Sequence, residues 1–433
     1  MDLIVNPPRE QWPDLCRRNI PADDADVSRA VEEIVGRVAR EGDAALRDYA
    51  RRFDGVELAD LRVSSAEIEA AADAVAADVK AAIERAAANI EAFHAAQLPR
   101  EITVETMPGV VCSQRPVPLR RVGLYIPGGR APLFSTVLML AIPARIAGCR
   151  DVVLFTPRGP EGIKAEILYA ARVAGVDTVY AVGGAQAIAA MAYGTESILR
   201  VDKIFGPGNR FVTKAKQLVS TVCSIDMPAG PSEVMILADS SARPDFVAAD
   251  MLSQAEHGPD SQAMAVVSDA GIAREVAGEV ESQMQRLSEA RRASVSGSLS
   301  KSRIIVLGSR REMLEFADLY GAEHLIISLD DADEAAAAIS AAGSIFLGNF
   351  SPESAGDYAS GTNHTLPTGG WARSLPGVNV DSFIHKITCQ RLSRDGLASL
   401  APTITAMARA EGLDAHAAAV TIRLKDDDDL TQA

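Results

Sequence analysis

The segment with the clearest potential for chemistry is 253–260, which reads SQAEHGPD. If it is helical, Gln254 and His257 are three residues apart and share one helix face, so that their donor atoms can converge on one ion. Alone the pair is a weak signal, because a surface glutamine and a histidine near a helix end often occur without a ligand. The segment becomes a candidate metal site only if further ligands join it.

Two other polar segments contain possible partners. One is Pro352–Tyr358, with Glu353 and Asp357, and the other runs from Glu411 to His416. Oxygen and nitrogen donors suit a zinc ion and leave room for a substrate to coordinate. These segments are far apart in the chain, so the site depends on a fold that brings them together.

A candidate acid/base pair, Glu323-His324, stands just before the apolar run Leu325–Leu329. A loop at the edge of a sheet can present both side chains to a cleft. The ordinary pKa of histidine, near neutrality, suits proton transfer. An isolated Glu-His pair is nevertheless more often part of an ordinary exposed loop, so this assignment too needs support from the rest of the chain.

The elements that must position these residues alternate in type. Short, continuously apolar runs are separated by helical patterns, which is typical of a parallel sheet covered on both faces. The predicted strands are 122–126, 152–155, 178–182, 234–237, 264–267, 303–307, 325–329 and 344–347, and the predicted helices between them are 136–148, 162–174, 209–220, 244–257, 271–287, 310–319 and 333–342. The pattern predicts an α/β fold with two doubly wound Rossmann-like lobes.

The ends of the chain are expected to differ from these lobes. Residues 1 to about 115 are rich in alanine and charge and are predicted to be helical, and the chain after Pro376 is predicted to be irregular and then helical. No GxGxxG motif follows a predicted strand. Glycine turns at 128–129, 183–184 and 206–208 are the local support for a dinucleotide.

Length and charge limit the possible functions. A chain of 433 residues exceeds the usual size of one hydrophobic core. The net charge is −15, and lysines and arginines form no dense stripe, which disfavours nucleic-acid partners. No apolar run approaches the roughly 20 residues that span a bilayer. Residues 1–10 lack the composition of a signal or transit peptide. We therefore expect a soluble, cytoplasmic protein that acts on a small molecule.

Over most of its length, from about Ala25 to Leu424, the chain resembles histidinol dehydrogenases. The matching segments are 121–129, 182–189, 205–209, 228–233 and 361–370. Several long matches in the right order are far more specific than one short motif. The resemblance implies a zinc-dependent, NAD-linked oxidation of L-histidinol through L-histidinaldehyde to L-histidine, the last steps of histidine biosynthesis, in a homodimer with shared active sites.

The resemblance also implies a role for each matching residue. It assigns the zinc ligands to Gln254, His257, Asp357 and His416. It makes His324 the acid/base of the hydride-transfer steps and Glu323 the residue that activates water. It places NAD against Tyr125, Gln186 and Asn209. The substrate contacts are Ser232, Gln254, His257, His324, Glu353, Asp357, His364, Glu411 and His416.

The expected domains are an N-terminal arm, two lobes and a C-terminal segment. The arm covers 1–21, the first lobe combines 22–118 with 240–375, the second, on the NAD side, covers 119–239, and the C-terminal segment covers 376–433. This last segment could be exchanged across the dimer. Glu411 and His416, with His364 as a further candidate, would then serve the neighbouring subunit's site.

Two alternatives stay open at this point. A paralogue in the same superfamily that oxidises another alcohol, such as a sulfopropanediol, would share the zinc ligands and the Glu-His pair, although Glu353, His364 and Glu411 together favour an imidazole substrate. The other is an inactive metal-binding scaffold that keeps the fold. The chain departs from the family pattern in the loop 371–377 and at Arg210, but neither departure touches a proposed ligand.

Overall fold

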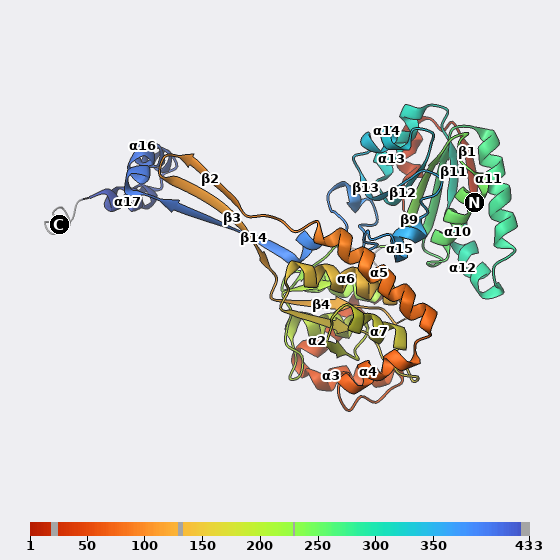
Figure 1. The fold of residues 1–433 in the computed structure, drawn as a ribbon, viewed down its shortest axis with the longest axis horizontal. Helices are drawn as coiled ribbons and strands as arrows, with labels where there is room; N and C mark the ends of the chain where they lie inside the picture. The colour runs from red at the N-terminus through yellow and green to blue at the C-terminus, as the bar shows by residue number, and fades with distance from the viewer. Residues whose placement is uncertain (19–24, 129–132, 228–229, 426–433) are drawn as a thin grey trace. The chain divides into compact units, whose positions relative to one another are not determined.

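The computed structural model describes residues 1–18, 25–128, 133–227 and 230–425. By their contacts they form two units, one of Met1–Gln97 and Leu119–Phe383 and the other of Leu98–Pro118 and Ile384–Ala433. The first unit contains two parallel sheets, each covered by helices (Figure 1). The predicted α/β class with two doubly wound lobes is thereby confirmed.

The first sheet has five parallel strands, and its central strand β4 (Arg121–Tyr125) is a short apolar run in which four of the five residues are buried. Its order is β6 (Thr178–Tyr180), β5 (Asp151–Phe155), β4, β7 (Lys203–Phe205) and β8 (Ser224–Ile225). The helices of this lobe are α6 (Phe134–Ala147), α7 (Ala165–Val173), α8 (Gly184–Tyr193) and α9 (Arg210–Val219). Helix α6 is apolar all round and almost entirely buried, as expected for a helix inside a large core.

The helices near the N-terminus belong to this five-stranded lobe. They are α2 (Ala25–Glu41), α3 (Asp43–Tyr49), the π-helix η2 (Ala50–Asp54), α4 (Ser65–Ala74) and α5 (Ala77–Ala95). Helix α2 contacts α8 and α9, α4 contacts α7, and α5 contacts α6. The structure therefore differs from the expected grouping of 22–118 with 240–375. The reason is that α2 buries one apolar face, from Val27 to Val38, against these helices.

The second sheet has six parallel strands. Its order is β1 (Asp2–Val5), β11 (Arg303–Val306), β10 (Gln262–Val267), β9 (Glu233–Ala238), β12 (Ala322–Ser328) and β13 (Ala342–Leu347). The helices of this lobe are α10 (Pro244–Ala255), α11 (Ala270–Met284), α12 (Glu289–Leu299), α13 (Arg310–Tyr320), α14 (Ala332–Ala337) and α15 (Glu353–Tyr358). Every residue of β9, β10 and β12 is buried, because two apolar clusters cover the two faces of the sheet.

The N-terminal arm is an edge of this second sheet. After β1 come η1 (Arg9–Gln11) and α1 (Trp12–Leu15), and the Trp12 ring packs edge-on against Phe316 with centroids 5.4 Å apart. The expected boundary at residue 21 falls in 19–24, outside the described residues.

The second unit is built on a three-stranded antiparallel sheet. The strands are β2 (Ile102–Met107), β3 (Val110–Pro118) and β14 (Ile384–Leu392), and β3 is central. Helices α16 (Arg394–Ala410) and α17 (Asp414–Thr421) follow β14. The helical prediction near residue 115 is wrong here. Gly109, at φ +77°, makes a tight turn between two segments rich in β-branched residues, and that hairpin signal was present in the sequence.

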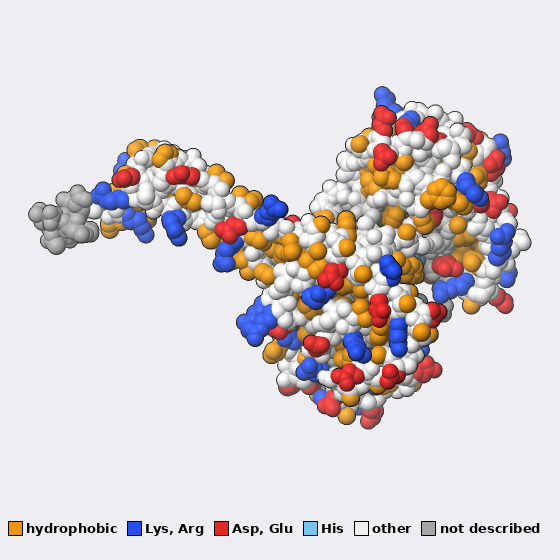
Figure 2. Space-filling model, in the orientation of Figure 1, with side chains coloured by type: hydrophobic (Ala, Val, Ile, Leu, Met, Phe, Trp, Pro, Cys, Tyr) orange, Lys and Arg blue, Asp and Glu red, His pale blue; other side chains and the backbone are white. Residues whose placement is uncertain are grey.

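The described residues also form three short 3-10 helices: η3 (Trp371–Arg373), η4 (Val380–Phe383) and η5 (Ile422–Leu424). No helix in the described part is long and apolar enough to cross a membrane. Figure 2 shows basic and acidic side chains interspersed over the face it presents.

Candidate metal and active site

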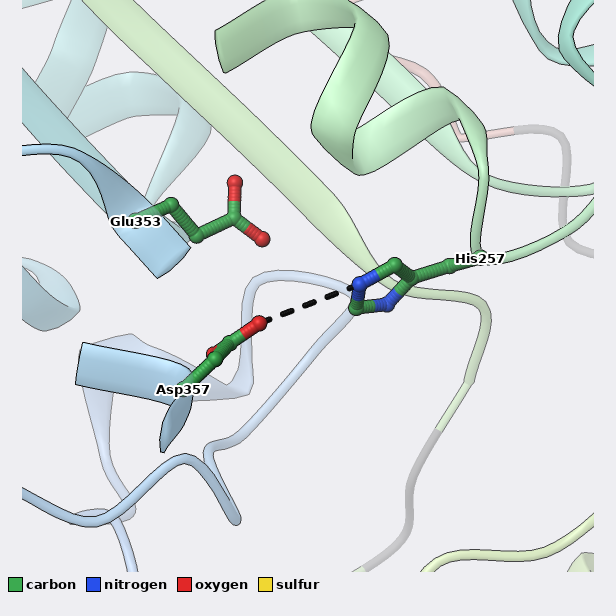
Figure 3. Close-up of side chains that lie close together, drawn as sticks. All are labelled: His257, Glu353 and Asp357. Atoms are coloured by element: carbon green, nitrogen blue, oxygen red, sulfur yellow. Dashed lines mark ion pairs between the residues drawn. The ribbon is translucent and has the colours of Figure 1, made fainter. Parts of the chain in front are cut away.

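Three predicted site residues meet at the surface of the six-stranded lobe. His257, Glu353 and Asp357 each offer one possible ligand atom, and these atoms lie within 4.8 Å of one another (Figure 3). The Nε2 atom of His257 is 3.8 Å from Oδ2 of Asp357. Glu353 and Asp357 are four residues apart on α15, so both carboxylates project from one face of that helix. The cluster can therefore hold a divalent cation.

The fourth predicted partner, Gln254, comes from the last turn of α10. This helix starts with Pro244 at its first turn and ends at Ala255, two residues before the predicted end. The His257 amide still donates to the Gln254 carbonyl (3.2 Å), which keeps the two residues in one helical turn. Helix α10 contacts α15, the element that carries the two carboxylates.

Several buried polar atoms near the cluster lack a partner. Both amide atoms of Gln254 and both carboxylate oxygens of Glu353 are buried without a hydrogen bond to any described residue. Buried polar groups are normally satisfied, because an unpaired one loses the hydrogen bonds that water would make. A set of oxygen donors with a histidine nitrogen fits zinc, and it leaves other polar atoms for a substrate.

Glu323 and His324 adjoin this cluster, but they do not lie in an edge loop as predicted. They are the second and third residues of β12, between β9 and β13, and both are buried. The amide of Glu233 donates to Oε2 of Glu323 (2.8 Å), and the Glu233 carbonyl lies 3.3 Å from Nδ1 of His324. Because this is the amino end of the strand, the usual location at the carboxyl ends of parallel strands does not apply here.

The imidazole of His324 lies among three carboxylates. Its Nε2 is 3.5 Å from Oδ1 of Asp357, and its Nδ1 is 3.6 Å from Oε2 of Glu323 and 3.7 Å from Oε1 of Glu353. Burial disfavours the imidazolium, but these three carboxylates outweigh burial and raise the pKa of His324 to about 10. The same group that could exchange a proton with a substrate is therefore directly coupled to the candidate ligands.

The carboxylates of the site respond differently to their surroundings. Burial raises the pKa of Glu323 to about 8, and it raises the pKa of Glu353 to about 8 as well. Asp357 is also penalised by burial, but His324 and the two other histidines nearby lower its pKa below the ordinary range. Asp357 is thus the carboxylate best suited to stay ionised and bind a cation.

His364 belongs to the same cluster. Its Nδ1 is 2.8 Å from the Asp357 carbonyl, and its Nε2 is 3.1 Å from the hydroxyl of Thr136 on α6. His364 thus lies beside Asp357 of its own chain, and its use by a neighbouring subunit's site stays a prediction. Ser232 immediately precedes Glu233, whose backbone holds the Glu323-His324 pair.

The two remaining predictions lie in the second unit. Glu411 is the C-cap of α16, and His416 lies on α17; both side chains are exposed. Exposure leaves both free to act as ligands, and the sequence predicts His416 for zinc and Glu411 for substrate.

The residues predicted to bind NAD gather in the five-stranded lobe. Tyr125 ends β4, and its hydroxyl accepts a hydrogen bond from the Gly184 amide (3.0 Å). Gln186 is buried next to Gly184, where a Cβ at residue 184 would lie 2.6 Å from its Oε1. The Asn209 side chain caps α9 by accepting from the amides of Phe211 (3.0 Å) and Val212 (3.1 Å). Gly129 lies outside the described residues.

Sequence reasoning missed two groups near the site. Asp250, one helical turn before Gln254, has its pKa raised by burial to about 7 and interacts electrostatically with Glu353. Arg18 and Glu233 form an ion pair, and the backbone of Glu233 contacts the Glu323-His324 pair. Glu233 stands directly before the predicted strand 234–237, and this position alone did not show that its carboxylate is buried and needs a partner.

Comparison with known proteins agrees with this geometry. The family model described as "Histidinol dehydrogenase" matches residues 17–424. Histidinol dehydrogenase from Bacteroides fragilis is 54% identical over 98% of this chain and 99% of its own length, and that from Aliivibrio fischeri is 52% identical over 93% and 91%. The crystal structure of histidinol dehydrogenase from Elizabethkingia anophelis is similar with a TM-score of 0.95 and 48% identity, over 98% of each chain. By its sequence, its fold and the grouping of its site residues, the chain belongs to the histidinol dehydrogenase family.

Proposed function

We propose that the chain is a zinc-dependent, NAD-linked enzyme that oxidises L-histidinol through L-histidinaldehyde to L-histidine, the last steps of histidine biosynthesis. The observation that supports this most is that buried side-chain atoms of Gln254 and Glu353 make no hydrogen bond to any residue the structure describes, beside Asp357 and His324. The paralogous alcohol dehydrogenase and the inactive scaffold are not favoured, because relatives that align over nearly the whole chain are histidinol dehydrogenases. A cytoplasmic location goes with this proposal.

In the proposed site, Gln254, His257, Asp357 and His416 hold the zinc ion. Bound zinc would orient the amine and imidazole nitrogens of the substrate. Glu353, Ser232, His364 and Glu411 contact the substrate, with the Glu353 carboxylate available for its ammonium group. Asp357, one of the three carboxylates that raise the pKa of His324, is a proposed zinc ligand, so a bound cation would lower that pKa toward the range a base requires.

His324 and Glu323 divide the proton transfers between them. His324 removes the hydroxyl proton of the alcohol while the carbinol carbon loses hydride, and the aldehyde forms. Glu323 then takes a proton from the water that adds to the aldehyde, and the hydrate loses the second hydride to give the carboxylate. Bound NAD would supply the hydride acceptor for each oxidation. Both residues are buried, which supports a site that keeps the aldehyde from solution.

The cofactor is proposed to bind the five-stranded lobe. Tyr125, Gln186 and Asn209 lie where strands end and helices α8 and α9 begin, and helix N-termini favour phosphate groups. The glycine turns at 183–184 and 206–208 would let the backbone approach the cofactor closely.

One assay tests the overall reaction. Purified protein is incubated with L-histidinol and NAD, and NADH and histidine are both measured. We expect two NADH per histidine, loss of activity after chelation, and recovery on addition of zinc. Turnover of dihydroxypropanesulfonate in place of histidinol, or the accumulation of free aldehyde with one NADH, would contradict the proposal.

The homodimer is proposed because His416 and Glu411 are exposed in the second unit, where a partner's site could use them. Mixing two inactive variants, His257→Gln and His416→Gln, tests this. If the sites are shared, half of the re-associated dimers carry one intact site, and activity returns to about a quarter of the wild-type level. If each chain completes its own site, the mixture stays inactive.

A further inference from the structure

Arg18 and Glu233 form a buried ion pair next to the Glu323-His324 pair. The guanidinium of Arg18 donates from Nε to Oε2 of Glu233 and from Nη2 to Oε1, both at 2.8 Å. The Arg18 side chain is 13% exposed and that of Glu233 is 2% exposed. Arg18 also lies over the ring of Tyr320, with its Cζ 3.7 Å from the ring centroid, and the Tyr320 hydroxyl is 3.3 Å from Oε2 of Glu233. The pair is therefore enclosed on several sides.

Arg18 connects the beginnings of two neighbouring strands. Glu233 is the first residue of β9. Nη2 of Arg18 also donates to the carbonyl oxygens of Tyr320 (2.6 Å) and Gly321 (3.3 Å), which directly precede β12. One guanidinium thus binds the side chain that opens β9 and the backbone that leads into β12.

The residues held in this way carry the proposed chemistry. The backbone of Glu233 contacts both members of the acid/base pair, because its amide donates to Glu323 and its carbonyl faces Nδ1 of His324. His324 is the register partner of Val234, the next residue of β9. A small displacement of the start of β9 relative to β12 would therefore move both catalytic side chains relative to Asp357.

Stability alone gives little reason to keep this arrangement. A buried ion pair can often be replaced by apolar residues without loss of stability, because desolvating two charges offsets their attraction. Positioning gives a clear reason, since the planar guanidinium presents several donors in fixed directions. Its Nε–H and the two N–H groups of Nη2 reach two carboxylate oxygens and two carbonyl oxygens, with one N–H shared between two acceptors.

We propose that Arg18 and Glu233 are positioning residues, which hold the amino ends of β9 and β12 so that Glu323 and His324 face the metal cluster. The inference rests on the proposed function for its kinetic consequences. It concerns residues to which neither the family resemblance nor the proposed mechanism assigns a role.

The first test compares Arg18→Met with Arg9→Met. Arg9 is a matched control because it lies in the same N-terminal arm and pairs with Glu312 and Glu315 near the surface. We expect Arg18→Met to lower kcat roughly 10- to 100-fold, with KM for histidinol within about 3-fold and zinc content unchanged. Arg9→Met should keep the wild-type kcat. A wild-type kcat in folded Arg18→Met would overturn the proposal.

A double variant separates positioning from folding. Arg18→Met/Glu233→Gln removes both charges and leaves neither one unpaired, so it should fold with a Tm near the wild-type value. We expect its kcat to remain reduced. Adding Arg18→Met to Glu323→Gln should cost less in kcat than adding it to the wild-type chain, because the two changes act through the same group. Full additivity would show that Arg18 does not act through Glu323.

Hydrogen exchange tests the same proposal without any substrate. The Glu233 amide should be protected in the wild-type chain and lose protection in Arg18→Met, while the amides of Val234–Ala238 keep theirs. Unchanged exchange at Glu233 would overturn the positioning role. Absence of histidinol oxidation by the wild-type chain would instead refute the proposed function, and the exchange result would still decide whether Arg18 holds the start of β9.

Discussion

The two sheets of the first unit present their polar residues at opposite ends. In the six-stranded sheet, Glu233, Glu323 and His324 lie at the amino ends of β9 and β12. In the five-stranded sheet, Tyr125 and the glycine turns after β6 and β7 lie at the carboxyl ends. The difference extends to hydrogen bonding. Gln254 and Glu353 have buried atoms that make no hydrogen bond within the described part of the chain, whereas Tyr125 and Asn209 are already hydrogen-bonded to backbone amides.

This contrast distinguishes two ways of building a binding site. Side chains that make no hydrogen bond can exchange protons or coordinate a ligand, because a ligand does not have to break an existing hydrogen bond to reach their atoms. Side chains that are paired with the backbone shape a surface instead. At Gly206, with φ +122°, a Cβ would lie 2.1 Å from the Tyr125 carbonyl. The buried Lys216 and Asp226 bind the carbonyl and the amide of the same glycine, both at 2.8 Å, and so hold this turn in place.

The largest effect is expected from His324→Gln, which changes the site at the amino ends of the six-stranded sheet. Loss of the acid/base should lower kcat by about 10³-fold while zinc remains bound. Steady-state kinetics and metal analysis would measure both quantities. The control is His385→Gln, since His385 lies exposed on β14 in the second unit. A His324→Gln variant with near wild-type kcat would remove the residue from the mechanism.

Glu353→Gln tests whether Glu353 contacts the substrate or binds the metal in the site of the six-stranded sheet. Losing one charged contact to the substrate ammonium should cost about 1.5–3 kcal/mol, which is roughly a 10- to 100-fold rise in KM for histidinol. Zinc content should stay at one per chain. Loss of zinc would make Glu353 a metal ligand, which its distance to His257 and Asp357 permits. Glu334→Gln, an exposed carboxylate on α14, serves as the control.

Substitutions of Asn209 test the five-stranded lobe, where the predicted NAD-binding side chains are hydrogen-bonded to backbone amides. Asn209→Ala removes the cap of α9 and should lower the free energy of unfolding by about 1 kcal/mol, with a higher KM for NAD. Asn209→Asp keeps a capping oxygen, so stability should return, but its negative charge should oppose phosphate binding and keep KM high. Denaturant unfolding and NAD titration measure the two effects. If Asn209→Asp restores both, the residue acts only as a cap.

The smallest effect concerns Asp54, also in the five-stranded lobe. Burial alone raises the pKa of Asp54 to about 6, so the folded chain binds this proton more tightly than the unfolded chain does. Stability from this group is therefore present below an ordinary carboxyl pKa and is lost as pH rises from about 4 to about 6. Asp54→Asn should flatten that part of the stability curve. An unchanged curve, measured by unfolding at several pH values, would contradict this assignment.

Most residues of the candidate site could be picked out from the sequence because they lie in short polar segments. The segments around Gln254, Glu323 and Glu353 stand out in this way, and the family resemblance connected them. The location of Glu323-His324 was not predictable from local sequence. A polar pair before an apolar run suggests a loop. In the structure this pair belongs to β12, which is paired with β9 on one side and β13 on the other.

Domain membership was also beyond local reasoning. Helices α2 to α5 have amphipathic patterns that require an apolar surface to pack against. Such a pattern does not show which of the two lobes provides that surface. The hairpin of β2 and β3 was missed because most residues of β2 are exposed, so alternation between buried and exposed positions is weak there.

The sequence by itself determined the α/β class, the strands of the two sheets other than β1, β7 and β8, and the residue types able to bind a cation and move protons. These follow from hydrophobic periodicity and side-chain chemistry, which are local properties. Only the tertiary structure decided that Asp357 lies 3.5 Å from His324 and that Arg18 holds the start of two strands. Those contacts join residues far apart in the chain, and their distances depend on how whole layers pack.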